Sequence, residues 1–161
     1  MAPSKKAPRT DLTPAGRLEE AGLQRVLGYQ LAQATIVTDA LYQRLVGTPF
    51  DVRPVEYTVL TLIDENPGGS LAQLARALAV TAPHITGIVD KLEAKGLVAR
   101  AQSDQDRRSQ VLHTTRSGAA LARKATEAII SGEQGSVPLT PGERAMLVEL
   151  LHKVACARTS S

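Results

Sequence analysis

Apolar residues recur with helical spacing in two short segments near the middle of the chain. In residues 71–78 they occupy positions 71, 74, 75 and 78, the i, i+3, i+4, i+7 pattern of one helical face. In residues 81–95 the same pattern is formed by Ile85, Ile88, Val89 and Leu92. Because two helices this short are joined only by residues 79–80, they cannot lie antiparallel, and we expect them to cross steeply as in a helix-turn-helix.

A polar segment between two strand-like runs follows the second helix. The runs are residues 97–100 and 110–115, and the segment between them contains Asp106, Arg107 and Arg108. A β-hairpin directly after a helix-turn-helix makes a winged helix, in which the second helix enters a DNA major groove. Arginine at the wing tip suits the adjacent minor groove or its phosphates, because its planar guanidinium is permanently charged and weakly hydrated. Asp106 is expected to hold that guanidinium in one orientation.

Helical patterns also precede the helix-turn-helix. Residues 15–46 predict one long helix or a bent pair, ended by Gly47-Thr48-Pro49. Pro54 suits the first turn of a further helix, which the run Asn66-Pro67-Gly68-Gly69 stops.

Two more helices are expected after the wing. Ser117 is predicted to cap a helix that runs to about Ile130, followed by a loop over residues 132–138. Thr140, with Pro141 next and glutamate at the capping-box position, begins the last helix. The predicted fold class is therefore mainly α with a small β-hairpin wing: a winged helix-turn-helix DNA-binding unit plus a helical dimerisation region.

The helical regions at both ends are too apolar to rest only on a small winged-helix unit. Packing them together, and against a second copy of the chain, would bury both apolar stripes. Two recognition helices about one helical turn (~34 Å) apart would then match a palindrome. We expect this homodimer rather than a monomeric bundle. The expected regions are a disordered basic tail (1–14), an N-terminal dimerisation region (15–49), the winged helix-turn-helix (50–116) and C-terminal dimerisation helices (117–158).

Composition adds modest information. The 161 residues are 43% hydrophobic but only 2% aromatic, so aliphatic side chains must fill the core. The net charge of +3 would not by itself indicate nucleic acid, but basic residues gather in or beside the winged helix-turn-helix. They include Lys91, Lys95, Arg100, Arg107, Arg108 and Arg116.

Several other classes of protein are disfavoured. The single cysteine, Cys156, excludes an internal disulfide, and no apolar run approaches the roughly 20 residues that span a bilayer. The N-terminus lacks the hydrophobic region of a signal peptide, so a cytoplasmic protein is expected. His152 and Cys156 have the spacing of two metal ligands, but no further ligand cluster accompanies them, and no metal or other cofactor is expected. No motif of an enzyme is present, and no catalytic residue is expected.

The run from residue 71 to residue 118 also carries a combined motif. It consists of Leu71-Ala72-Gln73-Leu74-Ala75, Thr81-Ala82-Pro83-His84-Ile85-Thr86, Val89-Asp90-Lys91-Leu92-Glu93-Ala94-Lys95-Gly96-Leu97-Val98, Asp106-Arg107-Arg108 and Thr115-Arg116-Ser117-Gly118. This combination resembles the MarR family of bacterial transcriptional regulators. Where that family often carries arginine in the recognition helix, this sequence has Ala82 and Gly87, and Ser103 replaces the first acidic residue usual in the wing.

The resemblance implies a set of DNA-contacting residues. Thr81 is first of all a cap, whereas His84 and Thr86 flank an apolar position and therefore point away from the core. Arg108 matches the family's wing arginine, and Arg107 is expected to contact a phosphate. The full set is Thr81, Ala82, Pro83, His84, Thr86, Lys91, Asp106, Arg107 and Arg108.

The resemblance also implies a small-molecule effector, bound between the dimerisation helices and the winged unit. Candidate residues are Tyr29, Gln33, Arg53 and Tyr57, with Arg53 suited to a carboxylate; the tyrosines are alternatively core filler. The expected function is that of a sequence-specific repressor, released from a pseudo-palindromic operator by an effector such as an aromatic acid or its thioester. The alternative is an architectural or protein-interaction winged-helix protein without effector control.

Overall fold

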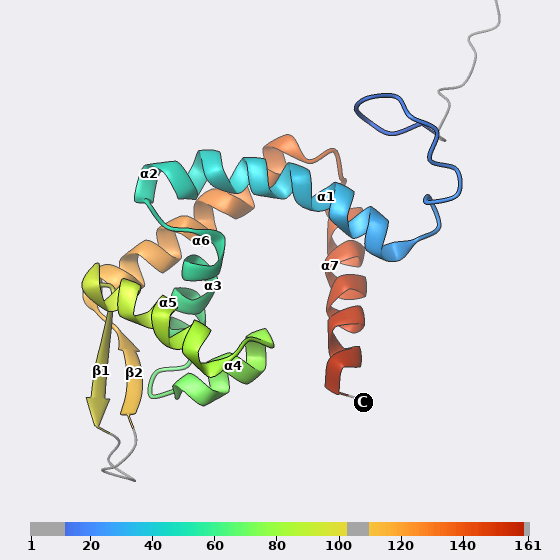
Figure 1. Ribbon diagram of the computed structural model, residues 1–161. Helices are drawn as coiled ribbons and strands as arrows, with labels where there is room; N and C mark the ends of the chain where they lie inside the picture. The colour runs from blue at the N-terminus through green and yellow to red at the C-terminus, as the bar shows by residue number, and fades with distance from the viewer. Residues whose placement is uncertain (1–11, 103–109, 160–161) are drawn as a thin grey trace, which may run out of the picture. The chain divides into compact units, whose positions relative to one another are not determined.

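The computed structural model describes residues 12–102 and 110–159, and it is mainly helical with one two-stranded hairpin (Figure 1). The predicted fold class is thereby confirmed. The expected wing-tip residues Asp106, Arg107 and Arg108 lie outside the described residues, as do Ser103 and most of the expected basic tail. The chain divides into two compact units, with the boundary after Ala40.

The first unit begins with turns rather than with the long helix predicted from residue 15. Helix α1 spans Leu27–Tyr42, so the predicted start is wrong by about three turns. The hydroxyl of Thr13 accepts a hydrogen bond from the Leu18 N–H (2.9 Å) and donates one to the Ala15 carbonyl (2.5 Å). Such local side-chain bonds offer the backbone an alternative to helix. The positive φ of Arg17 (50°) is likewise incompatible with a helix there.

The second unit opens with a helix that continues past the predicted stop at Gly47-Thr48-Pro49. A π-helical turn, η1 (Gln43–Gly47), leads into the short α2 (Thr48–Phe50). Proline is accommodated because it stands near the start of α2, where its missing N–H is not needed. The turn ends at Asp51, which adopts a left-handed conformation with φ of 49°.

The predicted helix-turn-helix is present. Helix α3 (Pro54–Glu65) precedes it, and α4 (Leu71–Leu78) and α5 (Ala82–Ala94) form it (Figure 1). Ala79 makes the turn between them in a left-handed conformation, with φ of 53°. Thr81 holds the N-cap position of α5, as predicted, but its side chain makes no capping hydrogen bond.

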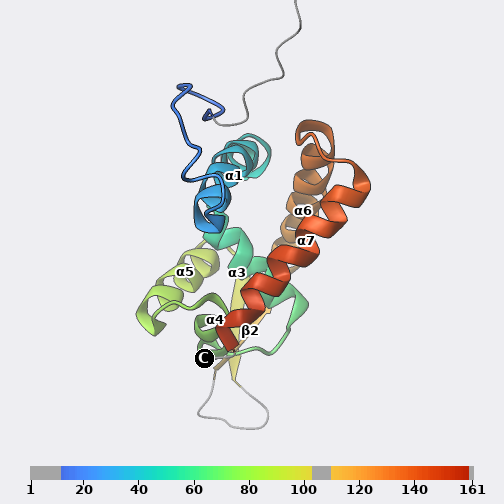
Figure 2. The ribbon, with the colours of Figure 1, turned by 90° about the vertical axis from the view of Figure 1, so that its right-hand side faces the viewer.

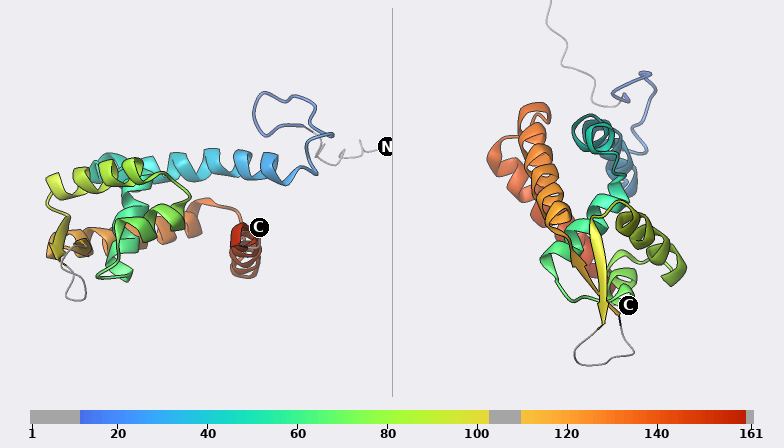
Figure 3. Two further views of the ribbon diagram at one scale, coloured as in Figure 1. Left: turned by 60° about the horizontal axis from the view of Figure 1, so that its bottom comes forward. Right: turned by 90° about the vertical axis from the view of Figure 1, so that its left-hand side faces the viewer.

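The predicted hairpin consists of β1 (Val98–Gln102) and β2 (Gln110–Thr114), paired antiparallel from Val98↔Thr114 to Gln102↔Gln110. The loop after α3 extends it, because the Gly68 N–H donates to the Leu112 carbonyl and the Leu112 N–H donates to Gly69 (both 2.9 Å). Its base packs against both α5 and α6 (Figure 3). The wing is therefore anchored at its base.

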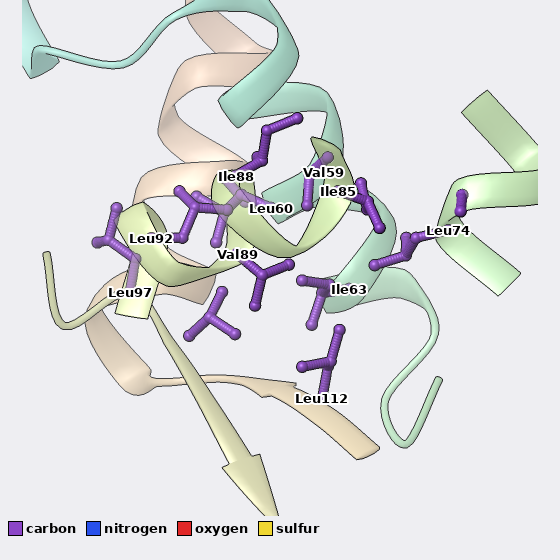
Figure 4. Packing of buried hydrophobic residues seen from close by; sticks show 13 residues of the cluster. Val59, Leu60, Ile63, Leu74, Ile85, Ile88, Val89, Leu92, Leu97 and Leu112 are labelled. Carbon is purple, nitrogen blue, oxygen red and sulfur yellow. The ribbon is translucent and has the colours of Figure 1, made fainter. Parts of the chain in front are cut away.

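A hydrophobic core holds α3, α4, α5 and the wing together (Figure 4). The stripe predicted for α5 is buried in it. Leu60, Ile85, Leu92 and Leu112 are among its largest fully buried side chains. The exposed side of α5 is thus set by the burial of the opposite side.

Helix α6 differs from its prediction at both ends. It spans Arg116–Ser136, with Thr115 rather than Ser117 as the N-cap. It does not end near Ile130, because Gly132 is a packing residue and not a stop. A Cβ at Gly132 would lie 2.2 Å from the side chain of Leu45, so glycine allows α6 to approach η1 closely.

Helix α7 (Pro141–Cys156) begins at the predicted capping box of Thr140 and turns back from the end of α6 (Figure 2). It continues into a 3-10 turn, η2 (Ala157–Thr159). None of its residues is buried in the single chain. Its exposed apolar residues are Met146, Leu147, Val148, Leu150, Leu151 and Val154.

Candidate nucleic-acid interface

The N-terminal half of α5 presents the residues expected to contact DNA. Thr81, Ala82, Pro83 and His84 are exposed. Thr86 is half-buried, and its hydroxyl donates to the carbonyl of Ala82 (2.9 Å). The structure brings these residues together because the stripe on the opposite side of α5 is fully buried in the core.

The exposed side of α5 has acidic residues on one flank and basic residues on the other. At about 100° per residue, Asp90 and Glu93 lie on the flank of Thr86, and His84 and Lys91 lie on the opposite flank. Lysine on this surface favours phosphate contact, whereas exposed carboxylates oppose it. The acidic flank therefore needs a neutralising partner.

Arg100 of β1 supplies that partner. Its guanidinium donates to the Asp90 carboxylate at 2.5 Å and also to the Glu93 carboxylate. The Arg100 side chain is only 20% exposed. It joins the wing to the recognition helix, and its single positive charge offsets one of the two negative charges. In the sequence Arg100 is recognisable only as a basic residue, because its partners are seven and ten positions away.

We expect Arg100→Met to weaken DNA binding by about tenfold, or ~1.4 kcal/mol. The variant keeps an apolar side chain but loses the ion pairs that join β1 to α5. The carboxylates of Asp90 and Glu93 would then repel the phosphates of a bound duplex. Fluorescence anisotropy with labelled duplex measures the loss, which should be larger at low salt. Adding Asp90→Asn and Glu93→Gln should recover part of the affinity. Affinity equal to wild type in Arg100→Met would contradict this role.

A second ionic cluster joins the start of α3 to the end of α5. Glu56 is buried, and its carboxylate accepts hydrogen bonds from the Arg53 backbone N–H (3.1 Å) and the Arg53 Nε (2.8 Å). Lys95 lies 3.6 Å from the same carboxylate and also pairs with Asp51 at 3.2 Å. Glu56 is not among the residues predicted from the sequence, although it stands three residues after the N-cap of α3, where a capping box has its glutamate.

The cluster makes stability depend on pH. Burial on its own would raise the pKa of Glu56, but the hydrogen bonds from Arg53 and the charge of Lys95 hold that pKa below its ordinary value of 4.5. A lowered folded-state pKa stabilises the protein above the unfolded pKa, and this contribution disappears as the pH falls through the folded pKa.

We therefore expect Glu56→Gln to be less stable than wild type at neutral pH. The difference should shrink as the pH falls below about 4.5, because the wild-type carboxyl then becomes neutral too. Urea unfolding, followed by circular dichroism at a series of pH values, measures the difference in free energy of unfolding and its dependence on pH. A difference that stays constant down to strongly acidic pH would show that Glu56 acts through shape and not charge.

The candidate effector residues fall in both units. In the first, the Tyr29 hydroxyl donates to Glu20 (2.5 Å), and Gln33 lies on the same helix, α1. In the second, the Tyr57 hydroxyl lies 2.7 Å from that of Thr126. Arg53 lines an open hollow of about 500 Å³, together with Lys91 and Lys95.

No group of three or more potential metal ligands occurs in residues 12–102 and 110–159. His152 and Cys156 do lie close on α7, with 3.6 Å between Nε2 and Sγ. Within the same ranges, every helix is too short or too polar to cross a lipid bilayer.

A helix-turn-helix followed by a hairpin, with an exposed recognition helix tied to that hairpin, defines a winged-helix DNA-binding protein. The family model for the MarR family matches residues 52–110. A relative from Thauera aromatica, named as a transcriptional regulatory protein for the hcr operon, is 34% identical over 80% of this chain and 78% of its own length. The chain belongs to the MarR family of transcriptional regulators.

Two further comparisons agree. The transcriptional repressor NicR of Pseudomonas putida is 31% identical, over 80% of this chain and 81% of its own length. The structure of the transcriptional repressor CouR bound to a 23-mer DNA duplex is similar, with a TM-score of 0.77 and 28% identity. The match covers 86% of this chain and 98% of that one. The chain is thus a DNA-binding transcriptional regulator of winged-helix type.

Proposed function

We propose that this regulator is a homodimeric repressor, which binds a pseudo-palindromic operator and leaves it when a small effector binds. The observation that carries the proposal is the exposed N-terminal half of α5, held beside a hairpin by the Arg100 ion pairs. A recognition helix and a wing in fixed relation can contact a major groove and the adjacent minor groove together.

Within this proposal the recognition helix contributes the base and phosphate contacts. His84 and Thr86 can hydrogen-bond base edges, and Lys91 can pair with a phosphate. The Thr81 hydroxyl is available for a phosphate because it makes no capping bond. The wing contributes Arg108, oriented by Asp106, and Arg107. The apolar Ala82 and Pro83 contact the groove without hydrogen bonds.

A second copy of the chain is the partner that would cover α7. Six large apolar residues on this helix are exposed in the single chain, and soluble monomers rarely expose so large a contiguous apolar patch. Burying them in a twofold interface places two recognition helices on one face of the duplex. A separation of ~34 Å matches one helical turn of DNA.

The proposed effector is a small aromatic acid or its thioester. This class of effector follows from the family resemblance, and Arg53 offers a guanidinium suited to a carboxylate. The other candidate contacts are Tyr29, Gln33 and Tyr57. An effector that favours a dimer with a different recognition-helix spacing would shift the population away from DNA. A coupling of ~1–3 kcal/mol lowers affinity roughly 5–150-fold.

Selection from a randomised duplex pool by the full chain tests the proposal. We expect enrichment of an inverted repeat, and a protein that sediments as a dimer. Benzoate, a hydroxybenzoate or a coenzyme A thioester of either should release the selected duplex in a mobility-shift assay. Binding that unrelated DNA displaces equally would instead favour an architectural protein.

A further inference from the structure

The N-terminal half of α5 carries none of the side chains that form paired hydrogen bonds with one base. Residues 81–87 include no arginine, lysine, asparagine or glutamine. In a helix-turn-helix, the N-terminal residues of the recognition helix are the ones that contact base edges. Arginine or lysine commonly reads guanine, and asparagine or glutamine commonly reads adenine, each through two hydrogen bonds. A recognition helix of this composition discriminates between bases by other contacts.

The exposed surface of this segment is mainly hydrocarbon. Ala82 and Pro83 are exposed, and they offer a methyl group and the methylenes of a ring. At about 100° per residue, Pro83 and Gly87 lie near the centre of the side opposite the buried stripe, and Ala82 and Thr86 lie on one flank of it. Gly87 adds no side chain. This surface favours contact with an apolar group of the groove.

The polar groups beside this surface accept hydrogen bonds rather than donate them. The Thr86 hydroxyl already donates to the Ala82 carbonyl (2.9 Å), so its lone pairs remain available. Asp90, one turn later, is a carboxylate paired with Arg100. Within residues 81–87, the one side chain with an N–H is His84, which lies on the other flank. Guanine presents two acceptors in the major groove, N7 and O6, and therefore finds no matching donor at Ala82 or Thr86.

An A·T pair fits the same surface. Its adenine presents the N6 amino group, a donor that the Thr86 oxygen can accept, and its thymine presents the C5-methyl group. Cytosine also has an amino donor in this groove, but it has no methyl group. The methyl group is therefore the feature by which an apolar surface distinguishes an A·T pair from a G·C pair.

We propose that Ala82 and Pro83 read A·T base pairs in the major groove, through apolar contact with the C5-methyl group of thymine. The proposal deepens the proposed function, and it rests on α5 being the recognition helix of a sequence-specific regulator. The operator half-sites should accordingly carry thymine, and not guanine, opposite the N-terminal half of α5.

Deoxyuridine in place of thymidine tests the proposal, because it removes the methyl group and leaves base pairing and charge unchanged. The duplex is the one that wild type selects from a randomised pool, substituted at one thymine position at a time in both half-sites. At one or more positions we expect a loss of affinity of about fourfold for each buried methyl group, or about 15-fold for the symmetric pair. Fluorescence anisotropy measures the loss.

Ala82→Gly and Pro83→Ala show whether these side chains make the contact. Each variant removes part of the apolar surface and leaves every charge in place. In at least one of them, the cost of deoxyuridine at a sensitive position should fall to less than about twofold per methyl group, because the effects of two groups in contact are not additive. Thermal unfolding followed by circular dichroism shows that each variant is folded.

Ala94→Gly is the matched control. Ala94 is exposed at the last residue of α5, about three turns after Ala82. The substitution removes the same methyl group as Ala82→Gly, but outside the N-terminal half of the helix. The cost of deoxyuridine in this variant should equal that in wild type at every position.

Deoxyuridine without effect at every thymine overturns the proposal. A cost that is the same in wild type, Ala82→Gly and Pro83→Ala also overturns it, because the methyl group would then act through the shape of the duplex. The same holds if the largest losses come from 7-deazaguanine, which lacks the N7 acceptor, because guanine would then be the base that is read. If the wild-type protein enriches no sequence from the pool, the proposed function itself fails, and this inference fails with it.

Discussion

Gly118→Ala is expected to lower the stability of this protein by about 3 kcal/mol or more, a large part of the 5–15 kcal/mol typical of a folded domain. The added Cβ would lie 1.9 Å from the carbonyl oxygen and 2.9 Å from the carbonyl carbon of Leu97. These are backbone atoms, which cannot rotate away as the end of a side chain can. The clash therefore forces α6 away from the start of the wing.

The surrounding contacts explain why such a shift is costly. The Thr115 side chain caps α6 through the Gly118 N–H (3.0 Å), and the Thr115 N–H donates to the Leu97 carbonyl (3.0 Å). The hydroxyls of Thr115 and Ser117 also donate to the Gly96 carbonyl, at 2.7 and 3.1 Å. Moving α6 breaks these bonds together, and Leu97 and Gly118 are buried.

Thermal unfolding followed by circular dichroism measures the effect. For a chain of this length, 3 kcal/mol corresponds to a fall in the midpoint of roughly 6–12 °C. Gly135 is on the same helix, but a Cβ there would lie in open space. The midpoint of thermal unfolding of Gly135→Ala should therefore not fall below that of wild type. If Gly118→Ala unfolds at the wild-type temperature, the close approach of α6 to Leu97 is not a requirement of the fold.

Arg108→Ala is expected to cause the largest loss of DNA affinity. A charged, bidentate contact is worth roughly 1–3 kcal/mol, and a dimer would lose it at two wings, for a total of about 2–6 kcal/mol. The side chain itself lies outside the described residues. In the sequence it stands between β1 and β2, whose ladder is paired to Gln102↔Gln110 and joined to α5 by Arg100.

A mobility-shift or anisotropy assay with the selected duplex measures this loss, and sedimentation should show the dimer unchanged. Arg123→Ala on α6 is the matched control, because it removes the same charge from an exposed site away from the wing. Equal affinity in Arg108→Ala and wild type would refute the assignment of the wing to DNA contact.

The elements with local signals were predicted well. The stripes of α4 and α5 and the capping box at Thr140 each depend on residues within about one helical turn. The same holds for the two strands, whose predicted bounds agree with β1 and β2 to within two residues. Family membership followed from these elements and from the wing motif between them.

The errors came from contacts that the apolar pattern does not record. Gly132 looks like a helix stop in sequence, but it is retained inside α6 because Leu45 packs against it. The start of α1 was placed too early because the hydroxyl bonds of Thr13 compete with helical periodicity. Neither outcome is visible from the apolar pattern alone.

By itself, then, the sequence determined the helix-turn-helix, the hairpin, their order and the family, because helical periodicity, caps and turns are encoded by neighbouring residues. Only the tertiary structure decided that Glu56 is buried among cations and that Arg100 pairs with both Asp90 and Glu93. It also decided that the space beside Gly118 is filled while the space beside Gly87 is open. Those properties depend on which segments meet in space. Burial, charge pairing and free volume are set by partners from other elements, and no local pattern specifies them.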